Sequence, residues 1–267
     1  MQILVFRSYG DLIILLQVLN NRTVEHPIQL MVSTHLKPLL ESLPNLNLSS
    51  NITLRYFDIG IDKGILRLFT NKNFFSLQTI KEIIKLKRIC NRKSVFYVEQ
   101  KVRCWALNFL FYPTSFLPIV KKGNVYKSYF NFFSMIDLNE NPETKGIKKV
   151  LLFPDSRKSS KQLPLEVVKD IINNNQKKII VAKFGNGIDH EETKYYNDFP
   201  TLIQLIQDAD FIISADSLPV HLAQYLNKPH YILYAKKINF NWLSPFAQSK
   251  QSYGLFNNYE NLSVNLV

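Results

Sequence analysis

The sequence has few of the features that mark secreted, disulfide-bonded or membrane-spanning proteins. Its 267 residues include two cysteines, Cys90 and Cys104, which form no disulfide framework and match no metal-ligand spacing. No segment reaches the roughly 20 consecutive apolar residues of a transmembrane helix. Residues 1–6 (MQILVF) read as a strand, without the basic region and cleavage site of a signal peptide. We therefore expect a cytoplasmic protein.

Several functional motifs are also missing. No expected strand is followed by G-x-G-x-x-G, which argues against a nucleotide-dependent dehydrogenase. No pair of acidic residues has metal-binding spacing, so no metal site is predicted. The chain has neither an RNA-binding signature nor a helix-turn-helix pattern, so a nucleic-acid partner is disfavoured.

Acidic residues are outnumbered by basic ones, 21 to 33, which gives a formal net charge of +12. Such a balance favours an acidic partner: nucleic acid, an anionic lipid surface or a phosphorylated small molecule. The densest group of cations lies between residues 81 and 103. It predicts either a solvated helix face or a binding surface, and the sequence alone favours neither. Its members are Lys81, Lys85, Lys87, Arg88, Arg92, Lys93, Lys101 and Arg103.

The chain is long enough, and with 46% hydrophobic residues apolar enough, to build a substantial core. Residues 137–149 form a polar stretch containing Pro and Gly, which has the composition of a linker. We therefore predict two domains, residues 1–145 and 146–267.

Short apolar runs without polar alternation recur in both halves and predict strands of parallel sheets that are covered on both faces. The strands are expected at residues 3–6, 28–33, 52–57, 94–98, 150–153, 178–183, 211–214 and 230–234. Helices are expected at residues 12–19, 34–43, 74–89, 164–173, 199–208 and 220–226. The aromatic stretch 103–120 contains Pro113 and Pro118, and we expect irregular or short helical structure there, either buried or lining an acceptor cleft.

Polar turns follow four of the expected strands. They read R-S-Y-G-D at residues 7–11, P-D-S-R-K-S-S-K at 154–161, F-G-N-G-I-D-H-E-E at 184–192 and A-D-S-L-P at 215–219. In a parallel sheet such turns meet helix N-termini at the carboxyl edge, where free amides attract phosphate. The simpler alternatives are that Asp11, Asp216 and Ser217 cap helices and that the turn at 154–161 is an ordinary basic loop. His221, one turn inside its helix, is expected to pack or to form hydrogen bonds there.

All four of these segments resemble parts of a known enzyme family, and the turn at 184–192 resembles its loop that meets the nucleoside of the donor. The motif D-S-x-P-x-H-L-A from Asp216, followed by a Lys-Pro stop and an apolar strand, resembles the donor-binding segment of the family 9 glycosyltransferases, the ADP-heptose:lipopolysaccharide heptosyltransferases and their relatives. The strand, R-x-x-x-G-D and apolar helix around Asp11 are similar to the start of those enzymes, and the loop through Lys161 is similar to their S-K-x-W-P segment. The family usually has Gly in place of Leu218, and its members are generally longer. The resemblance covers little of residues 24–149.

The resemblance implies an α/β protein of GT-B fold, in which two Rossmann-like domains face each other across a cleft. The N-terminal domain would bind the acceptor and the C-terminal domain the nucleotide-sugar. Asp11 matches the general base of the family. The implied donor-binding residues are Ser156, Lys161, Glu191, Glu192, Asp216, Ser217 and Leu218. The acceptor-binding residues that we expect are Arg7, Lys81, Lys85, Arg88 and Arg103.

The activity implied by this resemblance is inverting, metal-independent transfer of a heptose-like sugar. The donor would be a nucleoside diphosphate sugar, with ADP-heptose one candidate, and the acceptor a lipopolysaccharide core or related surface glycan. We expect no cofactor, a monomer, and peripheral contact with the inner membrane face through an anionic glycolipid. The alternative is a catalytically inactive relative that binds sugar nucleotides, because Leu218 and the short chain depart from the family pattern.

Overall fold

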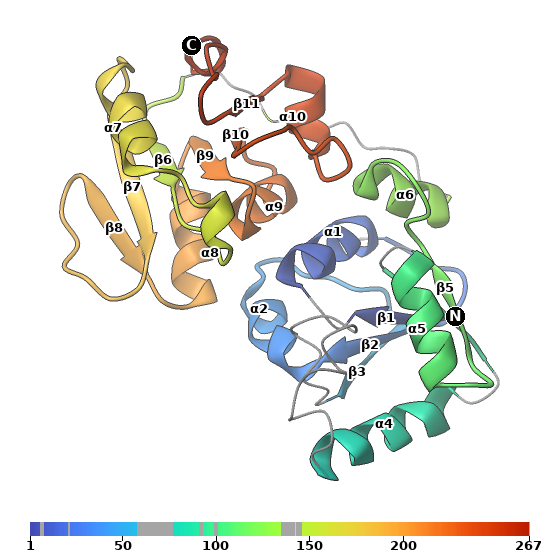
Figure 1. The fold of residues 1–267 in the computed structure, drawn as a ribbon. Helices are drawn as coiled ribbons and strands as arrows, with labels where there is room; N and C mark the ends of the chain where they lie inside the picture. Colours follow the sequence, from blue (N-terminus) through green and yellow to red (C-terminus); the bar gives the residue numbers. More distant parts are fainter. Residues whose placement is uncertain are drawn as a thin grey trace. The chain divides into compact units, whose positions relative to one another are not determined.

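The computed structural model describes residues 1–5, 8–20, 22–57, 77–90, 93–98, 101–134, 142 and 146–266 (Figure 1). The chain divides into two compact units, Met1–Ile136 and Asp137–Val267. The boundary predicted between residues 145 and 146 lies in the same polar stretch, of which residues 135–141 and 143–145 are outside the described residues. Each unit contains its own parallel sheet flanked by helices.

The described part of the first unit forms a five-stranded sheet in the order β3-β2-β1-β4-β5, with every pair parallel. Its strands are β1 (Gln2–Val5), β2 (Ile28–Ser33), β3 (Ile52–Phe57), β4 (Ser94–Tyr97) and β5 (Ser115–Pro118). Its helices are α1 (Tyr9–Leu19), the short η1 (Thr34–Leu36), α2 (Lys37–Ser42), α4 (Leu77–Cys90), α5 (Lys101–Leu110) and α6 (Val125–Phe132).

One part of the first unit corrects the prediction. Residues 103–120 were expected to be irregular or short helical, yet the structure has the helix α5 and the strand β5 there, and α6 follows them. Pro118 fits into β5 because this strand lies at the edge of the sheet, where proline is tolerated. The side chain of Asn108 joins the two elements by accepting the N–H of Phe116.

The described part of the second unit forms a six-stranded parallel sheet in the order β11-β10-β9-β6-β7-β8. Its strands are β6 (Val150–Phe153), β7 (Ile179–Phe184), β8 (Thr193–Tyr196), β9 (Phe211–Ala215), β10 (His230–Tyr234) and β11 (Tyr253–Leu255). Its helices are η3 (Ser159–Lys161), α7 (Leu165–Asn173), α8 (Phe199–Asp208), α9 (Leu218–Tyr225), α10 (Pro245–Lys250) and α11 (Leu262–Asn265). The edge strands β8 and β11 were not predicted.

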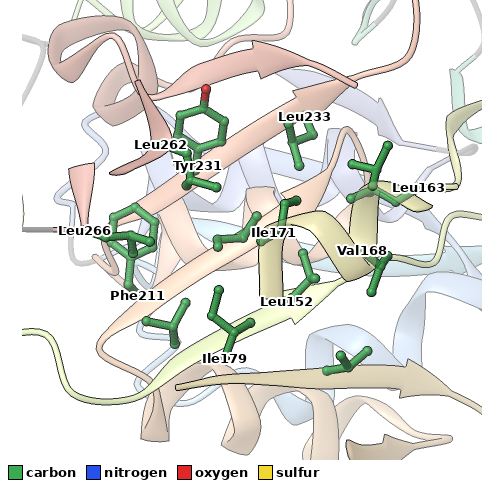
Figure 2. Packing of buried hydrophobic residues seen from close by; sticks show 14 of the residues in the cluster. Leu152, Leu163, Val168, Ile171, Ile179, Phe211, Tyr231, Leu233, Leu262 and Leu266 are labelled. Carbon is green, nitrogen blue, oxygen red and sulfur yellow. The ribbon is translucent and has the colours of Figure 1, made fainter. Parts of the chain in front are cut away.

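Two apolar layers cover the central strands of the second sheet. Alternate residues of β10 face opposite layers: Tyr231 and Leu233 pack with α7 and the C-terminal residues, while Ile232 packs with α9 and α10. Figure 2 shows the larger layer, in which Ile171 of α7 lies among side chains of the strands. Because both faces are covered, the strands have no polar alternation, as predicted.

Both sheets reverse their strand order beside their first strand. In the first sheet, β2 and β3 lie on one side of β1, while β4 and β5 lie on the other. In the second sheet, β7 and β8 lie on one side of β6, while β9, β10 and β11 lie on the other. Open α/β sheets bind ligands at the carboxyl ends of strands at such a switch point. The relevant turns are therefore those that follow β1 and β4 and those that follow β6 and β9.

The pairing of β6 with β9 is supported by Asp210. One oxygen of its carboxylate, Oδ2, accepts the N–H of Lys148 and that of Lys149 at 2.9 and 2.8 Å. These bonds lower the pKa of Asp210 below its ordinary value. Asp210 therefore ties the segment before β6 to the segment before β9.

We predict that Asp210→Ala lowers the free energy of unfolding by about 1 kcal/mol, because two backbone amides at the start of β6 lose an exposed, charged acceptor. Asp208→Ala should cost less, since the bond that Asp208 accepts from Gln204 is a local one within the same helix. The effect of Asp210 should be present above the pKa that it has in the unfolded chain and disappear as pH falls through its lowered pKa. Urea unfolding of the full chain at neutral and acidic pH measures this, and equal midpoints for both variants would contradict it.

Candidate functional site

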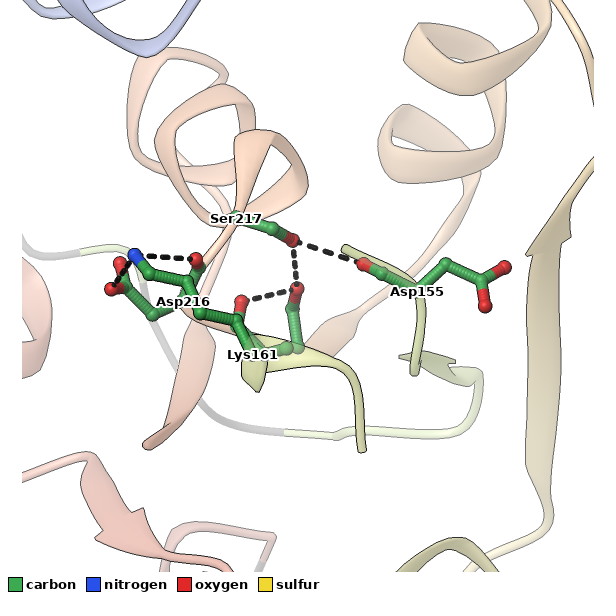
Figure 3. A network of polar contacts seen from close by, with 6 residues as sticks. Asp155, Lys161, Asp216 and Ser217 are labelled. Carbon is green, nitrogen blue, oxygen red and sulfur yellow. Dashed lines mark hydrogen bonds and ion pairs between the residues drawn. The ribbon is translucent and has the colours of Figure 1, made fainter. Parts of the chain in front are cut away.

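An ion pair links two turns at the switch point of the second sheet. Lys161, in the turn after β6, places its ammonium against the carboxylate of Asp216 in the turn after β9 (Figure 3). The same ammonium donates to the carbonyl oxygen of Asp216 at 3.3 Å. The side chain of Asp216 is 11% exposed and that of Lys161 is 37% exposed. The structure therefore brings together two residues that the sequence predicted for one site.

Ser217 and Asp155 extend this contact toward β7. The hydroxyl of Ser217 lies 3.4 Å from the carbonyl oxygen of Asp155 and 3.4 Å from the hydroxyl of Ser214. The carboxylate of Asp155 accepts the N–H of Phe184 at 2.8 Å, at the end of β7. Asp155 was not predicted, although its place two residues after β6 could have indicated it. These polar contacts thus connect the carboxyl ends of three neighbouring strands, β9, β6 and β7.

The N-terminus of α9 lies next to the ion pair between Lys161 and Asp216. Ser217 occupies the N-cap position, as the simpler alternative expected, but its side chain makes no capping hydrogen bond. Pro219 has no N–H, while Leu218 and Val220 present amides in the first turn. Leu218 is half-buried and is the first residue of the helix. The first turn therefore presents amide donors and the positive end of the helix dipole.

The loops around this helix end are basic. Exposed cations follow β6 at Arg157 and Lys158 and follow β10 at Lys236 and Lys237. Ser156, the other predicted donor residue of the β6 loop, is half-buried beside Asp155. An ammonium has three donors, and the contacts with Asp216 engage two of those of Lys161. The arrangement suits an anionic group such as a phosphate.

Two buried aromatic groups lie near the ion pair. Burial lowers the pKa of His221 to about 4, against the opposing effect of Asp216, so its imidazole is neutral at neutral pH. His221 packs edge-on against Trp242, with ring centroids 6.3 Å apart. The sequence predicted such a packing role for His221. The hydroxyl of Tyr234 is buried with no hydrogen-bond partner among the described residues. Burial, and then the charge of Asp216, raises the pKa of Tyr234.

Glu191 and Glu192 do not lie at this edge of the sheet, contrary to the prediction. β8 pairs in parallel with β7, with Thr193 opposite Val181, so the chain returns to the amino end of β7 before β8 begins. There Glu191 pairs with Lys178 at 3.0 Å, which lowers the pKa of Glu191. The carbonyl oxygen of Glu192 accepts the N–H of Val181. The carboxyl end of β7 instead presents residues 185–187, and the prediction failed because β8 has no recognisable apolar pattern.

Asp11 lies at the switch point of the first sheet. Ser8 is the N-cap of α1, and its hydroxyl accepts the N–H of Asp11 at 3.2 Å. The alternative in which Asp11 caps this helix is therefore wrong. Asp11 is the third residue of α1 and is 2% exposed. Burial, and then the charge of Asp11, raises the pKa of Tyr129 in α6 well above its ordinary value, which places the two side chains near each other.

A second polar group borders this turn and was not predicted. The hydroxyl of Ser33, at the end of β2, lies 2.7 Å from Nδ1 of His35. The hydroxyl of Tyr9, beside Asp11 in sequence, donates to the carbonyl oxygen of His35 at 3.2 Å. Ser33 ends β2 and His35 follows it, so both lie at the carboxyl end of a strand, as Asp11 does. Their position at the end of an expected strand is the sequence feature that could have indicated them.

The structure describes the side chains of three of the five predicted acceptor-binding cations. Lys81, Lys85 and Arg88 are exposed on α4. The last turn of this helix lies at the amino end of β1, where the side chain of Gln2 donates to the carbonyl oxygen of Ile89 at 3.4 Å. Asp11 follows the other end of β1, opposite this last turn, whereas the ammonium of Lys85 lies 5.5 Å from the centroid of the Phe57 ring at the carboxyl end of β3. Arg7 and the side chain of Arg103 lie outside the described residues.

In the part of the chain that the structure describes, no helix has the length and apolar character needed to cross a bilayer. Within the same residues, no three His, Cys, Asp or Glu side chains are grouped closely enough to hold a metal ion.

Comparison with known proteins shows the fold. No protein-family model matches the sequence, and no curated protein matches it. Solved structures do match. The Escherichia coli heptosyltransferase WaaC with ADP has a TM-score of 0.57 at 13% identity, over 96% of this chain and 92% of that chain. The glycosyl transferase family 9 protein from Veillonella parvula DSM 2008 has a TM-score of 0.57 at 17% identity, over 98% and 92%.

The ADP-heptose lipopolysaccharide heptosyltransferase II of E. coli is also similar, with a TM-score of 0.53 at 14% identity over 96% of this chain and 90% of that chain. At these low identities the likeness is one of fold. The resemblance predicted from the sequence is confirmed at that level: the chain has the α/β, GT-B-like fold of heptosyltransferases and of a family 9 glycosyltransferase.

Proposed function

We propose that this protein is a glycosyltransferase that takes a sugar from a nucleoside diphosphate donor. The observation that supports this most is the pair of Lys161 and Asp216 beside the N-terminus of α9, at the switch point between β6 and β9. A cation and free helix amides at the carboxyl edge of a parallel sheet form a site for a diphosphate. The shared fold with structures named as heptosyltransferases supports the same proposal.

In this proposal the diphosphate of the donor lies between the ammonium of Lys161 and the first turn of α9. Asp216 holds the ammonium in place through two contacts, so little conformational freedom remains to be lost when the phosphate arrives. The surrounding cations after β6 and β10 raise the local concentration of an anionic ligand. Because burial lowers the pKa of His221, its imidazole is neutral and does not compete with Lys161 for the carboxylate of Asp216.

Asp11 is the general base of the proposed transfer. Its carboxylate takes the proton from an acceptor hydroxyl while the hydroxyl oxygen attacks the anomeric carbon of the donor. The bond from that carbon to the diphosphate oxygen breaks on the opposite face, so the configuration is inverted. Lys161 and the amides of α9 stabilise the negative charge that develops on the departing diphosphate. No metal ion takes part in this proposed step.

We further propose a heptose-like sugar, with ADP-heptose as donor and a lipopolysaccharide core or related surface glycan as acceptor, in a monomeric cytoplasmic enzyme. The second candidate is a relative that binds sugar nucleotides without transfer. It is favoured by Leu218, whose side chain occupies the first position of α9, where Gly would let backbone approach a phosphate more closely.

The donor site predicts the effect of Lys161→Ala on nucleotide binding. Loss of a charge-assisted contact should weaken ADP binding by roughly 10- to 100-fold, or about 1–3 kcal/mol. Calorimetric titration of the full chain with ADP measures this. Lys178→Ala is the matched control, because it removes the same charge at the opposite end of β7, where Lys178 pairs with Glu191. Equal affinities for both variants would remove Lys161 from the site.

Melting temperatures separate a local effect from unfolding. Lys161 is more than a third exposed, and ion pairs of this kind contribute little to stability. Lys161→Ala should therefore melt close to the parent protein.

The role of Asp11 predicts that Asp11→Asn reduces transfer by roughly 100-fold or more. ADP affinity and melting temperature should barely change, because Asn has nearly the same size and Ser8 already caps α1. Release of ADP from ADP-heptose in the presence of a lipopolysaccharide core measures transfer, with Asp208→Asn as the control.

An Asp11→Asn variant as active as the parent would show that Asp11 is not the base. A parent protein that binds ADP-heptose but releases no ADP with any acceptor tested would favour the inactive relative. Leu218→Gly is then the variant in which transfer should appear.

A further inference from the structure

The hydroxyl of Tyr129 in α6 is a buried polar group that the proposed transfer does not yet use. Tyr129 is 0% exposed, and its hydroxyl oxygen has no hydrogen-bond partner among the described residues. Most buried polar side-chain atoms of native proteins are hydrogen-bonded, and an unpaired one destabilises the folded state. A second role for this hydroxyl, besides the packing of its ring, would explain why it is present.

The fold brings this hydroxyl to the switch point of the first sheet. α6 packs against α1, the helix that carries the buried Asp11 (Figure 1). Tyr97 is the last residue of β4, the neighbour of β1 at the switch point, and is 1% exposed. After burial, the charges of Asp11 and Tyr97 are the further causes that raise the pKa of Tyr129. One carboxyl group and two phenols from three elements therefore form one buried cluster.

Other polar groups border this cluster. Tyr9, on α1 itself, donates its hydroxyl to the carbonyl oxygen of His35, against whose ring it packs edge-on with centroids 5.9 Å apart. Ser8 accepts the N–H of Asp11 rather than contacting its carboxylate through this bond. Arg7 lies outside the described residues. Among these groups, Tyr129 is the one with a buried hydroxyl and no described partner.

The chemistry of the pair is that of a donor beside an acid. Burial disfavours a charged carboxylate, whereas each hydrogen-bond donor near it favours the charged form. Because the pKa of Tyr129 is raised well above its ordinary value, its phenol keeps its proton at neutral pH and is available as a donor. Asp11, in contrast, must be ionised to take a proton from an acceptor hydroxyl.

We infer that Tyr129 is a positioning residue for Asp11, whose carboxylate it orients and keeps ionised by donating its hydroxyl hydrogen. A bridging water or a small rotation of the Asp11 side chain completes this contact. Tyr129 neither gains nor loses a proton during transfer, since the proton of the acceptor hydroxyl passes to Asp11 alone. The inference rests on the proposed function, because Asp11 needs such help only if it acts as a base.

The test is the titration of Asp11 in the full chain, followed by NMR of protein labelled at the carboxyl carbon of Asp and assigned with Asp11→Asn. In Tyr129→Phe the midpoint of Asp11 should rise by about one pH unit, because a donor that favours the charged form is lost. The melting temperature should equal or exceed that of the parent, since Phe keeps the ring and removes an unpaired hydroxyl.

The matched control is Tyr225→Phe. Tyr225 ends α9 in the second unit, and its hydroxyl is likewise buried without a partner among the described residues. This variant undergoes the same chemical change away from the first sheet, so the midpoint of Asp11 should stay where it is in the parent.

Transfer gives a second readout. In Tyr129→Phe the acid limb of kcat/KM should move to higher pH by the same amount as the midpoint, and the rate at high pH should return to that of the parent. Equal Asp11 midpoints in Tyr129→Phe and the parent, or a loss of rate that is the same at every pH, would overturn the inference. A parent without transfer, in which the midpoint still rises on substitution, would refute the proposed function while supporting the contact between Tyr129 and Asp11.

Discussion

The ion pair between Lys161 and Asp216 joins two turns that are far apart in the chain and follow adjacent strands, β6 and β9. Without Asp216, the partly exposed ammonium of Lys161 would move among many rotamers, and a ligand would have to order it. With Asp216, the ammonium is already fixed beside the amide donors of α9. The proposed donor site depends on this arrangement more than on any other contact.

The architecture explains why the polar groups gather there. Apolar side chains cover both faces of the central strands of the second sheet, so its polar groups accumulate where strands end. Each sheet has one switch point, and each switch point has a distinctive acidic residue: Asp11 after β1 and Asp216 after β9. Their surroundings differ. Asp216 is paired with a cation, whereas Asp11 is buried in the first turn of a helix near Tyr129.

Much of the fold could be predicted from the sequence, because the central strands are short apolar runs bounded by polar turns. The strands β5, β8 and β11 could not, since edge strands such as Thr193–Tyr196 are short and lack such runs. The missed β8 also explains the error at Glu191 and Glu192. Lys161 and Asp216 were predicted together because their motifs follow strands, while Asp155, two residues after β6, was overlooked. The exposure of Trp105 and Phe109 on α5 required the structure, since the sequence does not show which side of this helix is covered.

A crystal structure of the chain grown with ADP would locate the diphosphate. We expect it within hydrogen-bonding distance of Nζ of Lys161 and of the backbone amides of Leu218 and Val220. Phosphates bound at the amino ends of β6 and β9, or ADP bound away from α9 with the contact between Lys161 and Asp216 undisturbed, would contradict this expectation.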